Sequence, residues 1–115
     1  MTRKEAFIAL NMVPHLGPVR LRRLLDIFDS PERVLSAKRN ELQRIDGLNQ
    51  ALIDSLASWE SVVDLQQELA RISNFGASVL TLEDADYPTL LREIHDPPTV
   101  LYVWGKLGQI GRAHV

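Results

Sequence analysis

Apolar side chains recur at helical spacing through the first 76 residues of the chain. Residues 3–11 form a short predicted helix with Phe7, Ile8 and Leu10 facing inward. A second helix is expected to begin at Pro18, because a proline at the first helical position loses no hydrogen bond. Its apolar stripe follows the i, i+3, i+4, i+7 pattern of one buried helix face, at Leu21, Leu24, Leu25 and Phe28.

Capping residues divide the helical part further. Ser30 is a predicted N-cap, with Pro31 in the first turn of the helix that follows. The expected buried side of that helix is formed by Val34, Leu35 and Ala37. Asn40 is expected to cap a short turn, and Asn49 is expected to cap the helical pattern that comes next.

That last helical pattern covers residues 50–75 in two adjacent apolar rows. Two rows imply a change of packing partner, so a bend or break is predicted near residues 58–61. Gly76 is the expected helix stop. The period then changes, and residues 78–82 are a short, β-branched, apolar stretch typical of a strand.

A proline-rich connector occupies residues 85–102 and contains one predicted helical turn at residues 89–92. It leads into a second strand at residues 100–104, whose nearly continuous apolar character is typical of a strand buried on both faces. Two strands and one helical turn cannot bury their own apolar surface. The sequence therefore predicts that this α/β part is truncated, and residues 108–115 are interpreted as a non-native, adapter-like tail.

Composition places the chain among cytoplasmic globular proteins. Of 115 residues, 45% are apolar and 24% charged, cysteine is absent, and no apolar run approaches membrane-spanning length. The start of the chain lacks the features of a signal peptide. The net charge of −2 is uneven, because residues 1–44 carry nine Lys or Arg against five Asp or Glu. A basic N-terminal part in an otherwise acidic protein favours a local surface that binds anions.

Two turns resemble the hairpin of a helix–hairpin–helix motif, in which glycines bring backbone N–H groups close to a DNA phosphate. The first covers residues 13–18, with His15 at the first glycine position and Gly17 at the second. The second covers residues 45–49, with Gly47 at the first position and Asn49 at the second. Two half-matches predict a tandem of this class. The added side chain of His15 and the donor missing at Pro18 favour a mainly structural role.

Six residues of the helical part are candidates for DNA contact. They combine the first hairpin with nearby positive charge: Leu16, Gly17, Arg20, Arg23, Lys38 and Arg39. The alternative is an ordinary solvated face, because Asp26 and Asp29 share the polar side of the second predicted helix. No aromatic residues interleave with these charges in the sequence, so base stacking is not indicated.

Catalytic and metal-binding signals are missing from the sequence. His15 and His95 have no neighbours at metal-ligand spacing, and the acidic cluster of Glu83, Asp84 and Asp86 is interpreted as turn-forming. No nucleophile–base pair or phosphate-binding glycine loop is present. We therefore expect no enzymatic activity, no cofactor and no bound metal in this chain.

The proline-rich connector also carries a family resemblance. The pattern Asp86-Tyr87-Pro88-x-x-Leu91-x-x-Ile94-x-Asp96-Pro97-Pro98-x-Val100-Leu101-Tyr102-x-x-Gly105 closely resembles the segment that leads into the Rossmann-like domain of the DprA/Smf family of DNA-processing proteins. The helical part also matches in order, through the 14–18 hairpin, the Leu24-Leu25-x-x-Phe28 run, Ser30-Pro31-Glu32, Gly47-Leu48 and Gly76-Ala77. The resemblance covers residues 4–107.

The resemblance implies a mainly α fold in three parts. Residues 1–76 would form a SAM-like or helix–hairpin–helix domain, residues 77–107 the truncated start of a Rossmann-like α/β domain, and residues 108–115 the tail. Tyr87 and the Pro97-Pro98 pair would pack against later strands and lack support in this chain. Residues 86–104 are therefore expected to be less buried than their apolar content suggests.

The resemblance also implies a function. Members are bacterial cytoplasmic proteins that bind incoming single-stranded DNA and hand it to the RecA recombinase during natural transformation, without a membrane partner. DNA binding and homodimerisation in the family lie chiefly in the Rossmann-like domain, whose anion-binding segment is expected just after Leu107. The alternative is a helical protein-interaction module that does not contact DNA directly.

Overall fold

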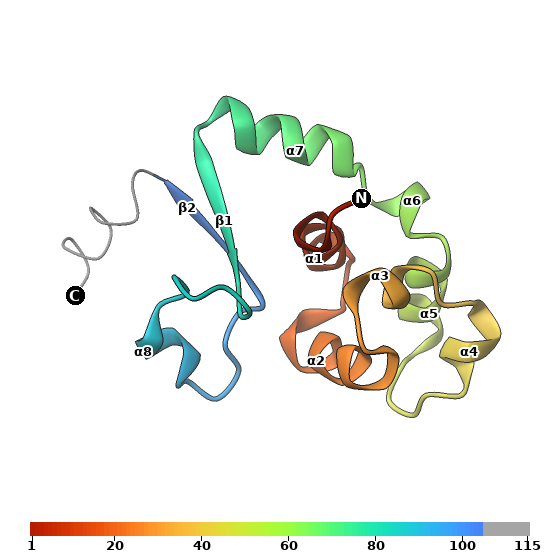
Figure 1. Ribbon diagram of the computed structural model, residues 1–115. Helices are drawn as coiled ribbons and strands as arrows, with labels where there is room; N and C mark the ends of the chain where they lie inside the picture. The colour runs from red at the N-terminus through yellow and green to blue at the C-terminus, as the bar shows by residue number, and fades with distance from the viewer. Residues whose placement is uncertain (105–115) are drawn as a thin grey trace.

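A computed structural model describes residues 1–104, so the predicted tail at 108–115 lies outside the described residues. Helices form most of this part, and one pair of strands follows them (Figure 1). The elements in chain order are α1 (Arg3–Met12), α2 (Gly17–Phe28), α3 (Pro31–Leu35), α4 (Arg39–Gln43), α5 (Gln50–Ala57), α6 (Trp59–Val62), α7 (Leu65–Asn74), β1 (Ala77–Thr81), α8 (Thr89–Arg92) and β2 (Val100–Trp104).

Side-chain caps start several of these helices. The predicted caps Ser30 and Asn49 accept hydrogen bonds from the main-chain N–H groups of Arg33 and Leu52, at 3.1 and 2.8 Å. The predicted cap at Asn40 was wrong, since α4 begins at Arg39 and its N-cap position is Lys38. The carboxylate of Glu41, in the first turn of α4, instead caps the helix by accepting a hydrogen bond from the main-chain N–H of Lys38 at 2.9 Å.

The helical pattern over residues 50–75 forms three helices. The predicted break is confirmed at Ser58, between α5 and α6. A second break, not predicted, falls at Val63 and Asp64. Val63 takes an extended conformation that turns its side chain into the core, and Asp64 caps α7 by accepting from the N–H of Gln67 at 3.0 Å. Gly76 ends α7 with the positive φ of 64° expected of a helix stop.

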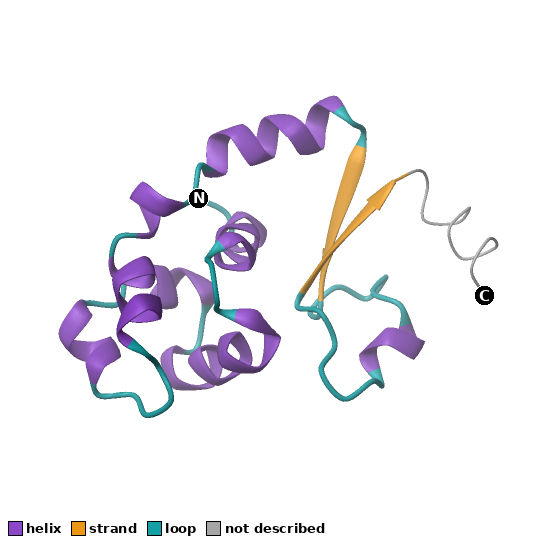
Figure 2. Ribbon diagram, turned by 180° about the vertical axis from the view of Figure 1, so that it is seen from behind, coloured by secondary structure: helices purple, strands orange, loops and turns teal. Residues whose placement is uncertain are grey.

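Helix α1 lies at the centre of the hydrophobic core. Its residues 6–10 are all at most 3% exposed, so it is apolar around its whole circumference in this stretch. In both views α1 lies between the sheet and the cluster formed by α2 to α5, while α7 spans from α6 to β1 (Figures 1 and 2). One cluster of buried side chains includes residues of the helices together with Val79 and Val100 of the strands.

The two strands were predicted, and they pair antiparallel. Ala77 lies opposite Trp104, and Thr81 lies opposite Val100. Helix α7 supports this pair, because the Tyr102 hydroxyl donates a hydrogen bond to the Glu68 carboxylate at 2.5 Å. Burial and the nearby Glu68 charge raise the pKa of Tyr102. A Rossmann-like continuation of this sheet stays a prediction, because the described residues contain these two strands alone.

The connector between the strands is better supported than expected. The prediction that Tyr87 and the Pro97-Pro98 pair lack partners in this chain was wrong. Tyr87 is 2% exposed, Pro97 is buried, and the Tyr87 hydroxyl donates to the Pro98 carbonyl at 2.7 Å. The connector folds back so that its two ends stabilise each other. The expected exposure is confirmed elsewhere, with Leu90 and Trp104 at 74% and 57%.

Ion pairs fasten the start of α1 to the turn after β1. The Arg3 guanidinium donates to both carboxylate oxygens of Glu83, at 2.7 and 2.6 Å, and Lys4 pairs with Asp84 at 3.2 Å. The hydrogen bond from Arg3 holds the pKa of Glu83 below its ordinary value. Asp84 also accepts from the main-chain N–H of Thr81 at 2.7 Å, which confirms the turn-forming interpretation of this acidic cluster.

Among residues 1–104, no helix combines the length and apolar character needed to cross a membrane.

Replacing Tyr87 with Phe tests the connector. The variant keeps the buried ring but leaves the Pro98 carbonyl without its donor, so the free energy of unfolding should fall by about 1 kcal/mol. Urea denaturation at neutral pH measures the loss. Tyr87→Leu also removes the ring and should cost more. Equal stability of Tyr87→Phe and the unmodified chain would show that the hydroxyl contributes nothing.

Acid titration tests the Arg3–Glu83 pair. Because the folded pKa of Glu83 is lowered, its contribution to stability is present above the ordinary glutamate value of about 4.3 and is lost as the pH falls through the folded value. Glu83→Gln should therefore lose stability at neutral pH and show a shallower decline below about pH 4.3. Glu93→Gln, at an exposed residue without an ion pair in the described part, is the control and should keep the full decline.

Candidate nucleic-acid interface

The first hairpin joins α1 to α2. His15 and Gly17 both take left-handed backbone conformations, with φ of 67° and 68°. Leu16 between them is 2% exposed, so its side chain belongs to the core and only its main chain remains for an outside contact. Gly17 itself is exposed, and no atom lies within 4 Å of the position that a Cβ would take there.

The second hairpin joins α4 to α5 and turns at Gly47, whose φ is 91°. Asn49 caps α5 by accepting from the N–H of Leu52 at 2.8 Å. Within the described part of the chain, no main-chain N–H group of residues 47–51 donates a hydrogen bond. These N–H groups cluster at the positive end of α5 and can donate to an anion.

Arginines of α2 reach this second hairpin. The Arg20 guanidinium donates to the Gly47 carbonyl at 3.4 Å and to the His15 carbonyl at 3.5 Å, so it links the two hairpins. The Arg23 guanidinium lies against Gly47, with one nitrogen 2.9 Å from the position that a Cβ would take. The fold thus brings two predicted site residues together at a turn more than 20 residues away in sequence.

The other two basic candidates lie at the opposite end of α4. Arg39 forms an ion pair with Asp54, and its hydrogen bond lowers the pKa of that carboxyl group. Lys38 forms no ion pair with any described residue. The six predicted site residues therefore occupy separate places: the first hairpin, the second hairpin with its α2 arginines, and the start of α4.

Arg44 is a further candidate for phosphate contact that the sequence-based list lacked. It is exposed, it directly precedes the second hairpin, and it has no ion pair among residues 1–104. The sequence could have indicated Arg44, because it directly precedes Ile45, where the second hairpin begins. Arg20, Arg23 and Arg44 outweigh Asp46, the acidic residue within this hairpin.

The first hairpin is less suited to an anion. A small pocket of about 220 Å³ beside it is lined by Gly17 and Pro18 and also by Asp96 and Pro98 of the connector. The negative charge of Asp96 would repel a phosphate there, and Pro18 has no N–H to donate. The second hairpin has N–H groups without an acceptor among residues 1–104, Arg20 and Arg23 against its turn and Arg44 directly before it in sequence, and it is therefore the candidate phosphate site. No group of three metal-ligating side chains occurs in the described part.

Comparison with known proteins supports the tandem-hairpin architecture. The sequence pattern of the SAM-like helix-hairpin-helix tandem family matches residues 7–58, which contain both hairpins. Protein Smf of Synechocystis sp. is 33% identical over 101 residues, or 88% of this chain. The chain is a homologue of the DprA/Smf family. It spans 25% of the length of that relative.

A second relative shares a shorter stretch. A DNA ligase of Leifsonia xyli subsp. xyli is 38% identical over 52 residues, which make up 45% of this chain and 7% of the ligase. No solved structure matches the chain. The predicted family and the mainly helical fold class, with its SAM-like helix–hairpin–helix tandem, are thus confirmed.

Gly47→Ala tests the contact between the second hairpin and α2. A Cβ at a φ of 91° is strained and would meet the Arg23 guanidinium, so the free energy of unfolding should fall by about 1–2 kcal/mol. Gly76→Ala is the matched control, because its φ is 64° and nothing lies within 4 Å of a Cβ there. Only Gly47→Ala should weaken the binding of a single-stranded oligonucleotide. Equal binding by both variants would contradict the assignment.

Proposed function

We propose that this chain belongs to a protein that acts in DNA-mediated natural transformation. In this proposal the protein binds incoming single-stranded DNA in the bacterial cytoplasm and loads the RecA recombinase onto it, without catalysing a reaction itself. Homology to the DprA/Smf family and the tandem hairpin domain support a DNA-processing role. The observation that carries the local part of the proposal is the second hairpin, where N–H groups without an acceptor among residues 1–104 lie near the guanidinium groups of Arg20 and Arg23, and where Arg44 directly precedes the turn in sequence.

The chemistry of this hairpin suits the DNA backbone. Main-chain N–H groups and guanidinium groups both donate to phosphate oxygens, and neither distinguishes one base from another. Three guanidinium groups at an exposed turn give a contact that is weak, independent of sequence and strongly dependent on salt. The helical part would then orient the strand, while tighter binding and homodimerisation would lie in the Rossmann-like domain that we propose to start at residues 77–107.

The second candidate is a protein-interaction module that does not contact DNA. The observation in its favour is that Arg20 donates to two main-chain carbonyls, which is a structural role. Arg23 and Arg44 distinguish the candidates, since neither guanidinium group donates a hydrogen bond to another described residue. Their positive charges remain available for a phosphate.

Removing these two charges tests the proposal. Arg23→Gln/Arg44→Gln should weaken binding of a fluorescent single-stranded oligonucleotide and reduce the slope of log K against log salt by about 1.4, or 0.7 for each lost phosphate contact. Anisotropy titrations at several salt concentrations give the slope. The control variant Arg22→Gln/Arg33→Gln also removes two positive charges, but from positions outside the second hairpin. It should keep nearly the full slope.

Two results would contradict the proposal. Equal slopes for both double variants would place the phosphate contacts elsewhere, and no binding by the unmodified chain at low salt would favour the protein-interaction module. The RecA step is tested separately, with the chain joined to its natural downstream sequence. That protein should accelerate assembly of RecA filaments on single-stranded DNA, and no acceleration would refute recombinase loading.

A further inference from the structure

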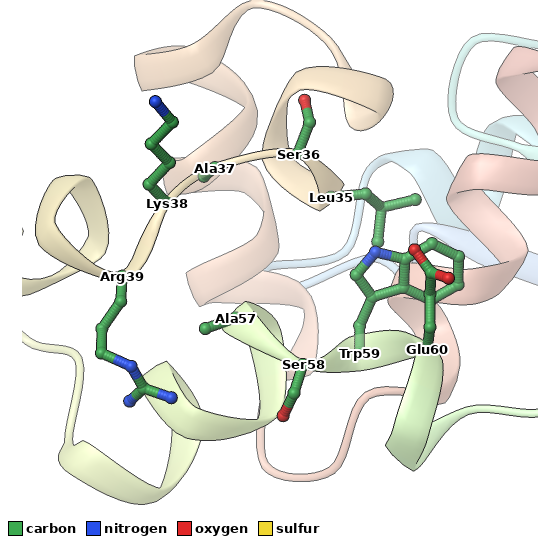
Figure 3. Close-up of a pocket in the computed structure, with 9 residues that line it drawn as sticks. All are labelled: Leu35, Ser36, Ala37, Lys38, Arg39, Ala57, Ser58, Trp59 and Glu60. Atoms are coloured by element: carbon green, nitrogen blue, oxygen red, sulfur yellow. The ribbon is translucent and has the colours of Figure 1, made fainter.

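An open depression of about 530 Å³ lies between the segment that joins α3 to α4 and the junction of α5 with α6 (Figure 3). Lys38 and Arg39 border it on one side, and Ser58, Trp59 and Glu60 border it on the other. The sequence alone showed no aromatic residue near Lys38 and Arg39. The fold places Trp59 across the depression from them.

Trp59 is held in place by the break at Ser58. It is the first residue of α6, and its half-buried ring packs against the core. Figure 3 shows the indole beside Leu35, on the wall of the depression. An indole anchored on one side and exposed on the other is a platform on which a flat ring can stack.

The polar side chains around Trp59 suit a nucleotide. Lys38 has no ion pair among residues 1–104, so its ammonium group is available for a phosphate. The Ser58 hydroxyl donates to the Asp54 carbonyl at 2.7 Å, which leaves its oxygen free to accept from a base N–H. Glu60 is the opposing charge in the depression, and Arg39 is already paired with Asp54.

The depression lies at the opposite end of α4 and α5 from the candidate phosphate site. Helix α5 begins directly after the second hairpin and ends at Ala57, on the edge of the depression. Helix α4 begins at Arg39 on the same edge and ends just before that hairpin. An eight-residue helix is about 12 Å long, so one short stretch of DNA strand can reach both places.

We propose that a single strand of nucleic acid bound at the second hairpin stacks one base on Trp59 and places a neighbouring phosphate on Lys38. This inference rests on the proposed function, because it extends the same strand along α4 and α5. An aromatic wall, together with a lysine on the rim that has no ion pair among residues 1–104, favours a nucleotide over a peptide. The site selects single strands, since bases in a duplex are already stacked on one another.

Tryptophan fluorescence tests the stacking in a Trp104→Phe background, in which Trp59 is the remaining tryptophan. An oligothymidylate should quench Trp59 as it binds, and an abasic oligodeoxyribose phosphate of equal length should bind without quenching. Fluorescence anisotropy of labelled oligomers measures binding independently of Trp59.

Two variants give the energetic test. Trp59→Leu keeps an apolar side chain against the core, and it should weaken oligothymidylate binding about tenfold while leaving abasic binding unchanged. Lys38→Gln should weaken both oligomers equally, and Arg33→Gln, which removes a charge outside the depression, should weaken neither by as much. Circular dichroism checks that each variant is folded.

The outcomes separate this inference from the proposed function. Binding without quenching, with equal affinity of Trp59→Leu, would overturn the stacking site and leave the hairpin contact standing. No binding of either oligomer would overturn both. Quenching by RecA in the absence of DNA, but not by oligothymidylate, would show that the depression holds a protein instead.

Discussion

The burial of residues 6–10 of α1 is the constraint on which the rest of the structure depends. Their side chains are removed from water on every side of the helix, and each large one contributes about 1.5–3 kcal/mol when fully buried. A short helix can be covered in this way only if neighbours surround it. The hairpin helices therefore pack on one side of α1 and the β1–β2 pair on another, so both parts of the chain share one core (Figure 1).

This shared core also positions the charges. Because α1 packs against the turn after β1, Arg3 and Lys4 form ion pairs with Glu83 and Asp84. Arg39 forms an ion pair with Asp54. Within the part of the chain that the structure describes, the basic residues of the first 44 positions that form no ion pair therefore lie on α2 and at the ends of α4. The first hairpin lies beside the connector, and the second is exposed, with N–H groups at residues 47–51 that have no acceptor among residues 1–104.

Local features were predictable from the sequence, and long-range contacts were not. Helix periodicity, caps such as Ser30 and Asn49, and the Gly76 stop depend on neighbouring residues, which a sequence displays directly. The contact of Arg23 with Gly47 depends on how α2 lies against another hairpin, and no local pattern encodes it. Trp59 and Lys38 line one depression because the α3–α4 segment lies beside the α5–α6 junction, which no local pattern encodes either. Tyr87 was misjudged because its acceptor, the Pro98 carbonyl, comes from a connector that folds back on itself.

The central claim is that phosphate binds at the second hairpin, and backbone amide NMR tests it most directly. A ¹⁵N-labelled chain is titrated with a short single-stranded oligonucleotide at low salt, and the amide shifts are followed residue by residue. The account predicts the largest, salt-sensitive shifts at residues 47–51 and little change at Gly17 of the first hairpin and at Val19 just after it. Shifts concentrated at the first hairpin, or none at either, would contradict it.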